Sequence, residues 1–329
     1  MLARMGLVAA LSTLGADLAV AVSQPAAACA VELGENASLG GARPFADDDP
    51  WNRDISQEPV DPRSAAIVAR IGAEYPVRAD FGSGRYHGSR IGIPYVVVPE
   101  DQPLVPVHFT DWPHESDAGP YPIPPDAPIE GEGGTAGPYD RHVIVVQRDL
   151  SRPGCLGRLF ELFDARPSED GGWQAANGAV FDLASNTLRP AGWTSADAAG
   201  LPIFPGLVRY DEVASGEIRH ALRVTVPETR RAYVHPARHW ASASTDPDLP
   251  PMGTRLRLKA DFDLSPLPEE AQVIGRALKR YGMIVADNGG GWFISGAPDE
   301  RWDNDRLRWL GEIHGRDLEV LELRDVVAP

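Results

Sequence analysis

Proline and glycine limit what this chain can fold into more than any other feature of its sequence. The 329 residues include 31 prolines and 33 glycines. Both residue types destabilise the interior of a helix, because proline lacks an N–H and clashes with the preceding turn, and because glycine loses much backbone entropy on folding. Short strands joined by turns accommodate both. The sequence therefore excludes a helix bundle and predicts a mainly β fold.

Apolar and β-branched runs, separated by turn residues, indicate where the strands lie. Because no regular helices separate these runs, we expect antiparallel sheets that form a β-sandwich or jelly roll. A few peripheral helices are expected near residues 62–71, 268–281 and 300–313, where apolar side chains recur at helical spacing. The predicted strands cover residues 94–98, 105–109, 142–147, 159–163, 179–183, 218–226 and 255–258.

The N-terminus has the pattern of an export signal. Arg4 precedes a short apolar stretch over residues 7–22, and three alanines at 26–28 supply the small residues that a signal peptidase requires. We therefore predict a signal peptide over residues 1–28, a mobile leader over 29–49 and a single β-rich globular domain over 50–329. No later stretch reaches the roughly 20 apolar residues of a membrane-spanning helix. The expected location is secreted or periplasmic.

Two cysteines, Cys29 and Cys155, leave three alternatives open. They form a disulfide, as is common in exported proteins, or they remain two thiols. Cys29 also follows directly on the small residues, so the third alternative is a lipid tether attached to it. Two thiolates are too few for a metal site built on cysteine.

The charge balance restricts the partners. The chain carries 47 acidic against 31 basic residues, a net charge of −16, and has no basic cluster. A polyanion would be repelled, so nucleic acid is excluded as a partner. A polysaccharide or oligosaccharide remains compatible, and we expect the protein to be a monomer.

Carboxylates within predicted strands are candidates for acid–base chemistry. Glu161 lies inside the run 159–163 among apolar residues, where burial would raise its pKa as a general acid requires. Asp182 lies in a neighbouring run, and Asp140 and His142 open another. Glycoside hydrolysis needs two carboxyl groups roughly 5–9.5 Å apart. We therefore predict Glu161 as the acid and Asp182 or Asp140 as the base or nucleophile. The alternatives are that Glu161 only pairs with Arg141 or Arg158, and that Asp182 only begins the turn at Ser185-Asn186.

Aromatic and acidic residues in proline-rich loops are candidates for substrate binding, because rigid loops commonly present ligand sites. Trp112 and Tyr121 lie in one such loop, and Trp193 and Asp197 lie in a loop of small residues. Aromatic faces can stack on sugars while carboxylates accept hydrogen bonds from hydroxyls. The first loop also holds Glu115 and Asp117, whose oxygens would suit a structural calcium ion. Apart from that ion, no cofactor is expected.

A different set of residues favours another chemistry. His220, or a tyrosine, could abstract a proton beside a uronate carboxylate while Arg223 and Lys259 neutralise the acid, as a polysaccharide lyase requires. The acidic net charge counts against such a substrate. A third hypothesis, a non-catalytic glycan-binding protein, needs only the aromatic residues.

Several stretches between Asp140 and Lys259 carry a resemblance to known sequences, and the likeness extends from Trp51 to the C-terminal hairpin. The chain resembles a group of secreted microbial β-rich proteins of unassigned function, which implies secretion and a polysaccharide context. Our leading hypothesis is thus a secreted carbohydrate-active enzyme, a glycoside hydrolase that acts on an extracellular polysaccharide through paired carboxylates. The stretches are Asp140-Arg141-His142, residues 159–163, 192–197, 206–209 and 218–222.

Overall fold

The computed structural model describes residues 29–132 and 139–329. The predicted signal peptide, residues 1–28, lies outside the described residues. Within the described part of the chain, every helix is too short or too polar to cross a membrane.

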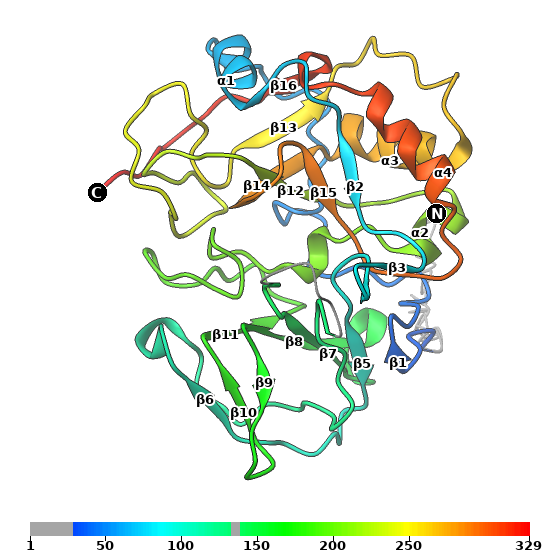
Figure 1. The fold of residues 1–329 in the computed structure, drawn as a ribbon, viewed down its shortest axis with the longest axis vertical. Coiled ribbons are helices and arrows are strands. Elements are labelled where there is room, and N and C mark those ends of the chain that lie inside the picture. Colours follow the sequence, from blue (N-terminus) through cyan, green and yellow to red (C-terminus); the bar gives the residue numbers. More distant parts are fainter. Residues whose placement is uncertain (1–28, 133–138) are drawn as a thin grey trace, which may run out of the picture.

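The chain folds into two lobes, one above the other in Figure 1. The upper lobe contains a six-stranded sheet with the order β16-β13-β14-β12-β15-β2. Chain segments far apart in sequence meet in this sheet, since β2 comes from the N-terminal third and β16 from the C-terminus. The strands are β2 (Arg78–Asp80), β12 (Leu222–Val226), β13 (Arg255–Leu258), β14 (Met283–Asn288), β15 (Phe293–Ser295) and β16 (Leu318–Val320).

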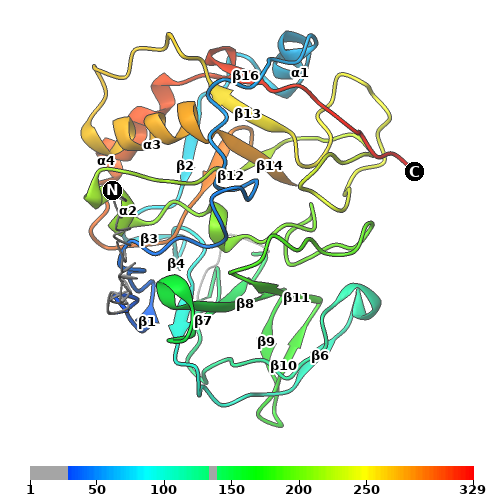
Figure 2. The same ribbon diagram turned by 180° about the vertical axis from the view of Figure 1, so that it is seen from behind.

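Helices cover one face of the upper sheet, as the view from behind shows (Figure 2). Alternation along β12 sends Leu222 and Val224 to this face, where they join a core with Ile274 and Leu278 of α3. The opposite face of the sheet, which carries Arg223, is turned toward the lower lobe. The helices are α1 (Ser64–Ile71), α2 (Tyr210–Ser215), α3 (Glu269–Arg280) and α4 (Asn304–Leu307), which the 3₁₀ segment η4 (Arg308–Glu312) continues.

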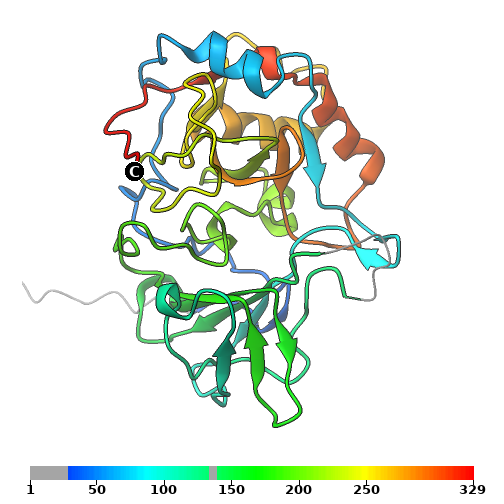
Figure 3. The same ribbon diagram turned by 60° about the vertical axis from the view of Figure 1, so that its left-hand side comes forward.

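The lower lobe is built on a five-stranded sheet with the order β1-β5-β7-β8-β11. A three-stranded sheet, β6-β10-β9, packs on one of its faces, and the turned view of Figure 3 separates this lobe from the upper one. A short hairpin, β3 (Arg85–Tyr86) and β4 (Ser89–Arg90), adjoins both lobes. The sheet strands are β1 (Gly34–Glu35), β5 (Val96–Val98), β6 (Val107–Phe109), β7 (Val143–Arg148), β8 (Leu156–Phe163), β9 (Arg166–Pro167), β10 (Trp173–Ala175) and β11 (Asn177–Asp182).

Strand β7 is buried on both sides. Val143 and Val145 face the core beside the three-stranded sheet, whereas Ile144 and Val146 face the core toward the upper lobe. A strand covered on both faces reads as a continuous apolar run, which explains the sequence Val-Ile-Val-Val. His142, just before the strand, has the same parity as Ile144 and points toward the upper lobe.

The predicted β-rich class with peripheral helices is confirmed. The sheets are mixed, however, because β5–β7, β6–β10, β12–β14 and β2–β15 pair in parallel. Long loops and helices make these crossovers possible, and turn residues alone do not reveal them. Residues 29–49, expected as a mobile leader, instead lie against the lower sheet. There β1 pairs with β5, and Val31 and Leu39 are buried.

Cys29 and Cys155 form a disulfide that links two residues 126 positions apart in the sequence. We expect Cys155→Ser to lower the free energy of unfolding by about 2–4 kcal/mol, because the bridge restricts the unfolded chain. Denaturant titration measures this loss, and the double variant Cys29→Ser/Cys155→Ser should match the single one. A single variant as stable as the oxidised protein would show that the bridge contributes nothing to stability.

Candidate functional site

The lower face of the upper sheet carries a row of polar side chains. The pairing places Ser295 of β15 next to Asp80 of the edge strand β2, and Thr225 of β12 next to Asp287 of β14. Alternation puts Arg223 on the face of Thr225. Asp80, Arg223 and Asp287 therefore come from three strands and share the face that the lower lobe covers.

Arg223 organises this face. Its guanidinium donates to both carboxylate oxygens of Asp197 at 2.8 Å, and to the Ser295 hydroxyl at 2.7 Å. A weaker contact of 3.4 Å reaches Asp287 Oδ2. The Asp197 side chain is 0% exposed and that of Arg223 only 4%. The paired fork geometry satisfies two buried opposite charges that neither residue could keep alone.

His142 and Glu130 approach from the lower lobe. His142 Nδ1 lies 2.6 Å from Glu130 Oε2, and Nε2 lies 3.0 Å from the Ala196 carbonyl, to which only an N–H can donate. Burial alone would lower the pKa of His142, but the charge and hydrogen bond of Glu130 and the charge of Asp140 raise it to about 9. At neutral pH the pair is thus an imidazolium beside a carboxylate.

Asp140 completes the lower side of the site. Its carboxylate is exposed, and one ligand atom each from Glu130, Asp140 and His142 lie within 4.8 Å of one another. These are the side chains that could hold a metal ion, and among the described residues no other group of this kind occurs. An ion bound there would have to replace the proton that His142 shares with Glu130. Without a metal ion, His142 and Glu130 form an ion pair, and the exposed Asp140 carboxylate lies beside it.

The carboxylates of the site differ in their proton affinity. Burial raises the pKa of Asp287 to about 7, helped by the charge of Asp197 and opposed by Arg223. Burial also raises the pKa of Asp80, with contributions from Glu130 and Asp140, although solvent reaches its side chain. Glu130 behaves oppositely, because His142 outweighs its burial and lowers its pKa.

Aromatic side chains extend from the site toward the surface. The Phe163 ring lies 5.8 Å from His142 and 6.2 Å from Trp112, measured between centroids. Trp112 is 42% exposed. Of the aromatic residues predicted to bind substrate, Trp112 is therefore the one that combines access to solvent with a link to the candidate site.

Glu161 and Asp182, the predicted carboxylate pair, are not brought together. Glu161 lies opposite Ala179 across the β8–β11 pair, whereas Asp182 lies opposite Arg158, three residues further and on the other face of the sheet. Asp182 forms an ion pair with Arg152. Glu161 shares its face with His142, but its carboxylate is 0% exposed.

The Glu161 carboxylate caps a turn. It accepts the backbone N–H of Ile203 at 3.0 Å and that of Phe204 at 2.9 Å, at the start of η3 (Phe204–Gly206). Burial raises its pKa to about 7, against the lowering effect of these two N–H groups. The predicted burial is therefore present, but the carboxylate holds the chain between the lobes and does not face an opening.

We expect Glu161→Gln to affect stability more than turnover. The amide cannot accept with both of its terminal atoms, so the variant should lose about 1–2 kcal/mol of unfolding free energy. Activity at a temperature well below unfolding should stay within about threefold of the unchanged protein. Asp182→Asn serves as the surface control and should change neither quantity. A loss of turnover in Glu161→Gln at unchanged stability would return Glu161 to the mechanism.

The predicted calcium ligands are engaged by protein donors. The Glu115 carboxylate accepts the Thr194 N–H at 2.9 Å, and Asp117 binds Arg189 and the Val180 N–H. These contacts fasten the loop over residues 111–117, including the 3₁₀ segment η1 (Pro113–Glu115), to the lower lobe.

The remaining binding candidates are partly withdrawn from solvent. Tyr121 is fully buried and donates its hydroxyl to the Asp117 carbonyl at 2.7 Å. Trp193 is half-buried beneath the Arg189 guanidinium. Asp197 and Arg223 bind each other, so neither is free for a ligand. Their effect on the site is to position Asp287.

The residues of the predicted lyase set have separate partners. His220 is buried, with Nε2 3.1 Å from Glu212 Oε2 and Nδ1 2.8 Å from the Ala221 carbonyl. Lys259 donates to the Arg316 carbonyl on the outer edge of the upper sheet. Arg223 is committed to Asp197. His220, Arg223 and Lys259 therefore do not form the arrangement of one base and two free cations that the lyase hypothesis requires.

Sequence reasoning found Asp140 and His142 but missed Asp80, Glu130 and Asp287. Asp287 lies directly before a glycine-rich turn, and its neighbours there indicate only a hairpin. Glu130 and Asp80 lie in segments without a periodic pattern. A usable signal existed for Asp287 alone, since it follows the apolar run 283–286, and the ends of buried strands commonly carry functional groups.

A scan of the chain against protein-family models finds no match, and no curated protein or solved structure matches it either.

Proposed function

We propose that this protein is a glycoside hydrolase acting on an extracellular polysaccharide, with its reaction centre at the polar face between the lobes. One observation carries the proposal: a carboxyl group that burial keeps protonated lies within electrostatic reach of an exposed carboxylate of the other lobe. Burial raises the pKa of Asp287 to about 7, and the charge of Asp140 contributes to this rise. A protonated carboxyl group near an exposed carboxylate suits the acid and the base or nucleophile of glycoside hydrolysis.

In the proposed reaction, Asp287 donates its proton to the glycosidic oxygen as the bond to that oxygen breaks. Asp140, exposed on the opposite lobe, acts as the nucleophile or as the base that activates water. The imidazolium of His142 keeps Glu130 ionised, and the guanidinium of Arg223 holds the Asp197 carboxylate in place. Trp112 and Phe163 offer aromatic faces to the sugar rings.

The disulfide supports an oxidising location, because such bridges persist outside the cytoplasm. The export signal predicted for residues 1–28 is in agreement with it. A secreted or periplasmic hydrolase would meet polymeric glycans directly.

The chemistry of the products tests the proposal. Purified protein is incubated with a panel of neutral and acidic polysaccharides, and new reducing ends and ultraviolet absorbance are measured. Reducing ends without absorbance support hydrolysis. An absorbing unsaturated product would replace hydrolysis with the lyase reaction. Binding without either product would identify a glycan-binding protein.

The pH dependence of hydrolysis should follow Asp287. A general acid must be protonated, so we expect kcat/KM to fall about tenfold per pH unit above pH 7. The rate is measured from pH 5 to 8.5, with the melting temperature recorded as a control at each pH. The His142–Glu130 pair stabilises the fold fully between about pH 4.5 and 6.5, and this stabilisation is lost on the alkaline side as the pH rises through about 9. If kcat/KM did not change between pH 6 and pH 8, Asp287 would be excluded as the acid.

A further inference from the structure

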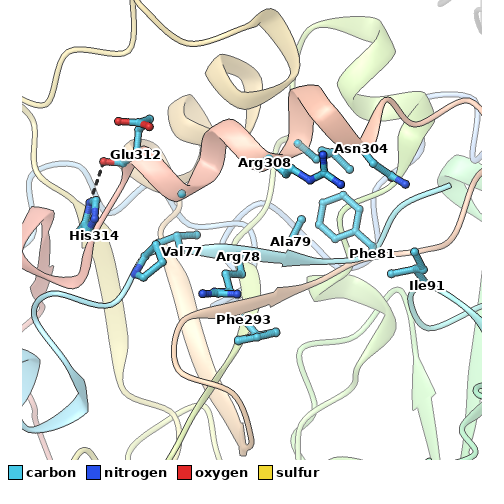
Figure 4. Close-up of a pocket in the computed structure, with 13 residues that line it drawn as sticks. Val77, Arg78, Ala79, Phe81, Ile91, Phe293, Asn304, Arg308, Glu312 and His314 are labelled. Atoms are coloured by element: carbon cyan, nitrogen blue, oxygen red, sulfur yellow. Dashed lines mark hydrogen bonds between the residues drawn. The ribbon is translucent and has the colours of Figure 1, made fainter. Parts of the chain in front are cut away.

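A groove runs along the outer edge of β2, beside the proposed reaction centre. It has a volume of about 580 Å³, large enough for a small-molecule ligand, and lies between β2 and the segment formed by α4 and η4 (Figure 4). Phe81, Ile91 and Phe293 supply apolar lining, and Arg78 and His314 supply polar groups. Figure 4 shows Arg78 and Phe293 on the same side of the two strands.

Arg78 is the cation that this groove leaves free. Its side chain is exposed, and its guanidinium carbon lies 5.9 Å from the centre of the Phe293 ring. Within residues 29–132 and 139–329 its guanidinium forms neither a hydrogen bond nor an ion pair. By contrast, Arg308, which also lines the groove, pairs with Asp305. A guanidinium fixed over an aromatic ring presents its fork to a carboxylate.

Arg78 lies on the sheet face that carries the reaction centre. Arg78 pairs with Phe293 in register, and Asp80 pairs with Ser295 one step further. Arg78 and Asp80 lie on the same face of β2, two residues apart, which corresponds to roughly 7 Å along the strand. Ser295 in turn receives a hydrogen bond from Arg223. A sugar chain that reaches Asp80 would place its next unit beside Arg78.

We propose that Arg78 binds a carboxylate of the substrate, so that the glycan carries acidic sugars. This inference rests on the proposed function. The net charge of −16 and the carboxylates around Asp80 repel a glycan with a charge on every unit. A single free cation accommodates one carboxylate. The substrate class is therefore a glycan in which carboxylated sugars occur singly among neutral ones.

Binding measurements with paired ligands test this inference. Acidic oligosaccharides that contain isolated glucuronate or galacturonate units, and the same oligosaccharides with their carboxylates reduced to alcohols, are titrated into Asp287→Asn by calorimetry. This variant is expected to slow turnover by about 100- to 1000-fold, so that binding is measured before cleavage. We expect reduction of the carboxylates to weaken binding about 10- to 100-fold for at least one ligand. Adding Arg78→Gln should abolish that difference, Arg78→Lys should restore part of it, and the matched control Arg308→Gln should retain it.

Equal binding of acidic and reduced forms throughout the panel would overturn the inference, as would a preference that survives Arg78→Gln. The outcome is separable from that of the proposed function. Binding through Arg78 without cleavage of any glycan would reject the hydrolase and keep the carboxylate subsite. Cleavage of reduced glycans as fast as acidic ones would keep the hydrolase and reject the subsite.

Discussion

Asp287→Asn is expected to lower kcat/KM for glycan hydrolysis by about 100- to 1000-fold at pH 6. At that pH the Asp287 carboxyl is largely protonated, because burial raises its pKa to about 7. Asparagine has nearly the same shape but carries no proton that it can give to a leaving group. Initial rates of reducing-end formation on the best substrate of the panel measure the loss.

The fold of this variant should persist. Asp287 Oδ1 accepts the N–H of Asn288 at 2.7 Å, and the amide oxygen of asparagine can take over this role. The melting temperature of Asp287→Asn should therefore remain close to that of the unchanged protein. Asp182→Asn is the matched control, since Asp182 pairs with Arg152 at the surface and should tolerate the change. Turnover in Asp287→Asn equal to that of the control would remove Asp287 from the mechanism.

The fold was predictable from the sequence where the signal was local. The run Val143–Val146 is apolar at every position and forms a strand covered on both faces. The helical spacing of Val273, Ile274 and Leu278 correctly locates α3. The pairing of β2 with β15, which are more than 200 residues apart, leaves no local trace. Parallel pairing depends on such long-range contacts, and an estimate based on turns favours antiparallel neighbours.

The candidate site was predictable only in part for the same reason. His142 is placed by the strand that it precedes, and its orientation follows from alternation with Ile144. Glu161 illustrates the opposite case, because a carboxylate inside an apolar strand does indicate an unusual environment. Its contacts with the N–H groups of Ile203 and Phe204 come from a loop 40 residues away. Local sequence distinguishes a buried carboxylate from an exposed one, but not a turn cap from a catalytic acid.

Removing the cation between the lobes should destabilise the whole molecule. We expect Arg223→Met to lower the free energy of unfolding by about 3–5 kcal/mol, because it leaves the fully buried Asp197 carboxylate without a counter-charge. Denaturant titration at pH 7 measures the loss. Arg223→Lys keeps the charge but not the two parallel hydrogen bonds, so its loss should be smaller.

A double variant separates the cost of the unpaired charge from the cost of lost packing. Arg223→Met/Asp197→Asn removes both charges, and it should be more stable than Arg223→Met alone because no ionised group is left buried. The double variant should lose at least about 2 kcal/mol less unfolding free energy than the sum of the losses of Arg223→Met and Asp197→Asn measured singly. Additive losses at the two positions would contradict this account. In that case Arg223 would stabilise the sheet through its contact with Ser295 and its packing, and the pair with Asp197 would contribute little.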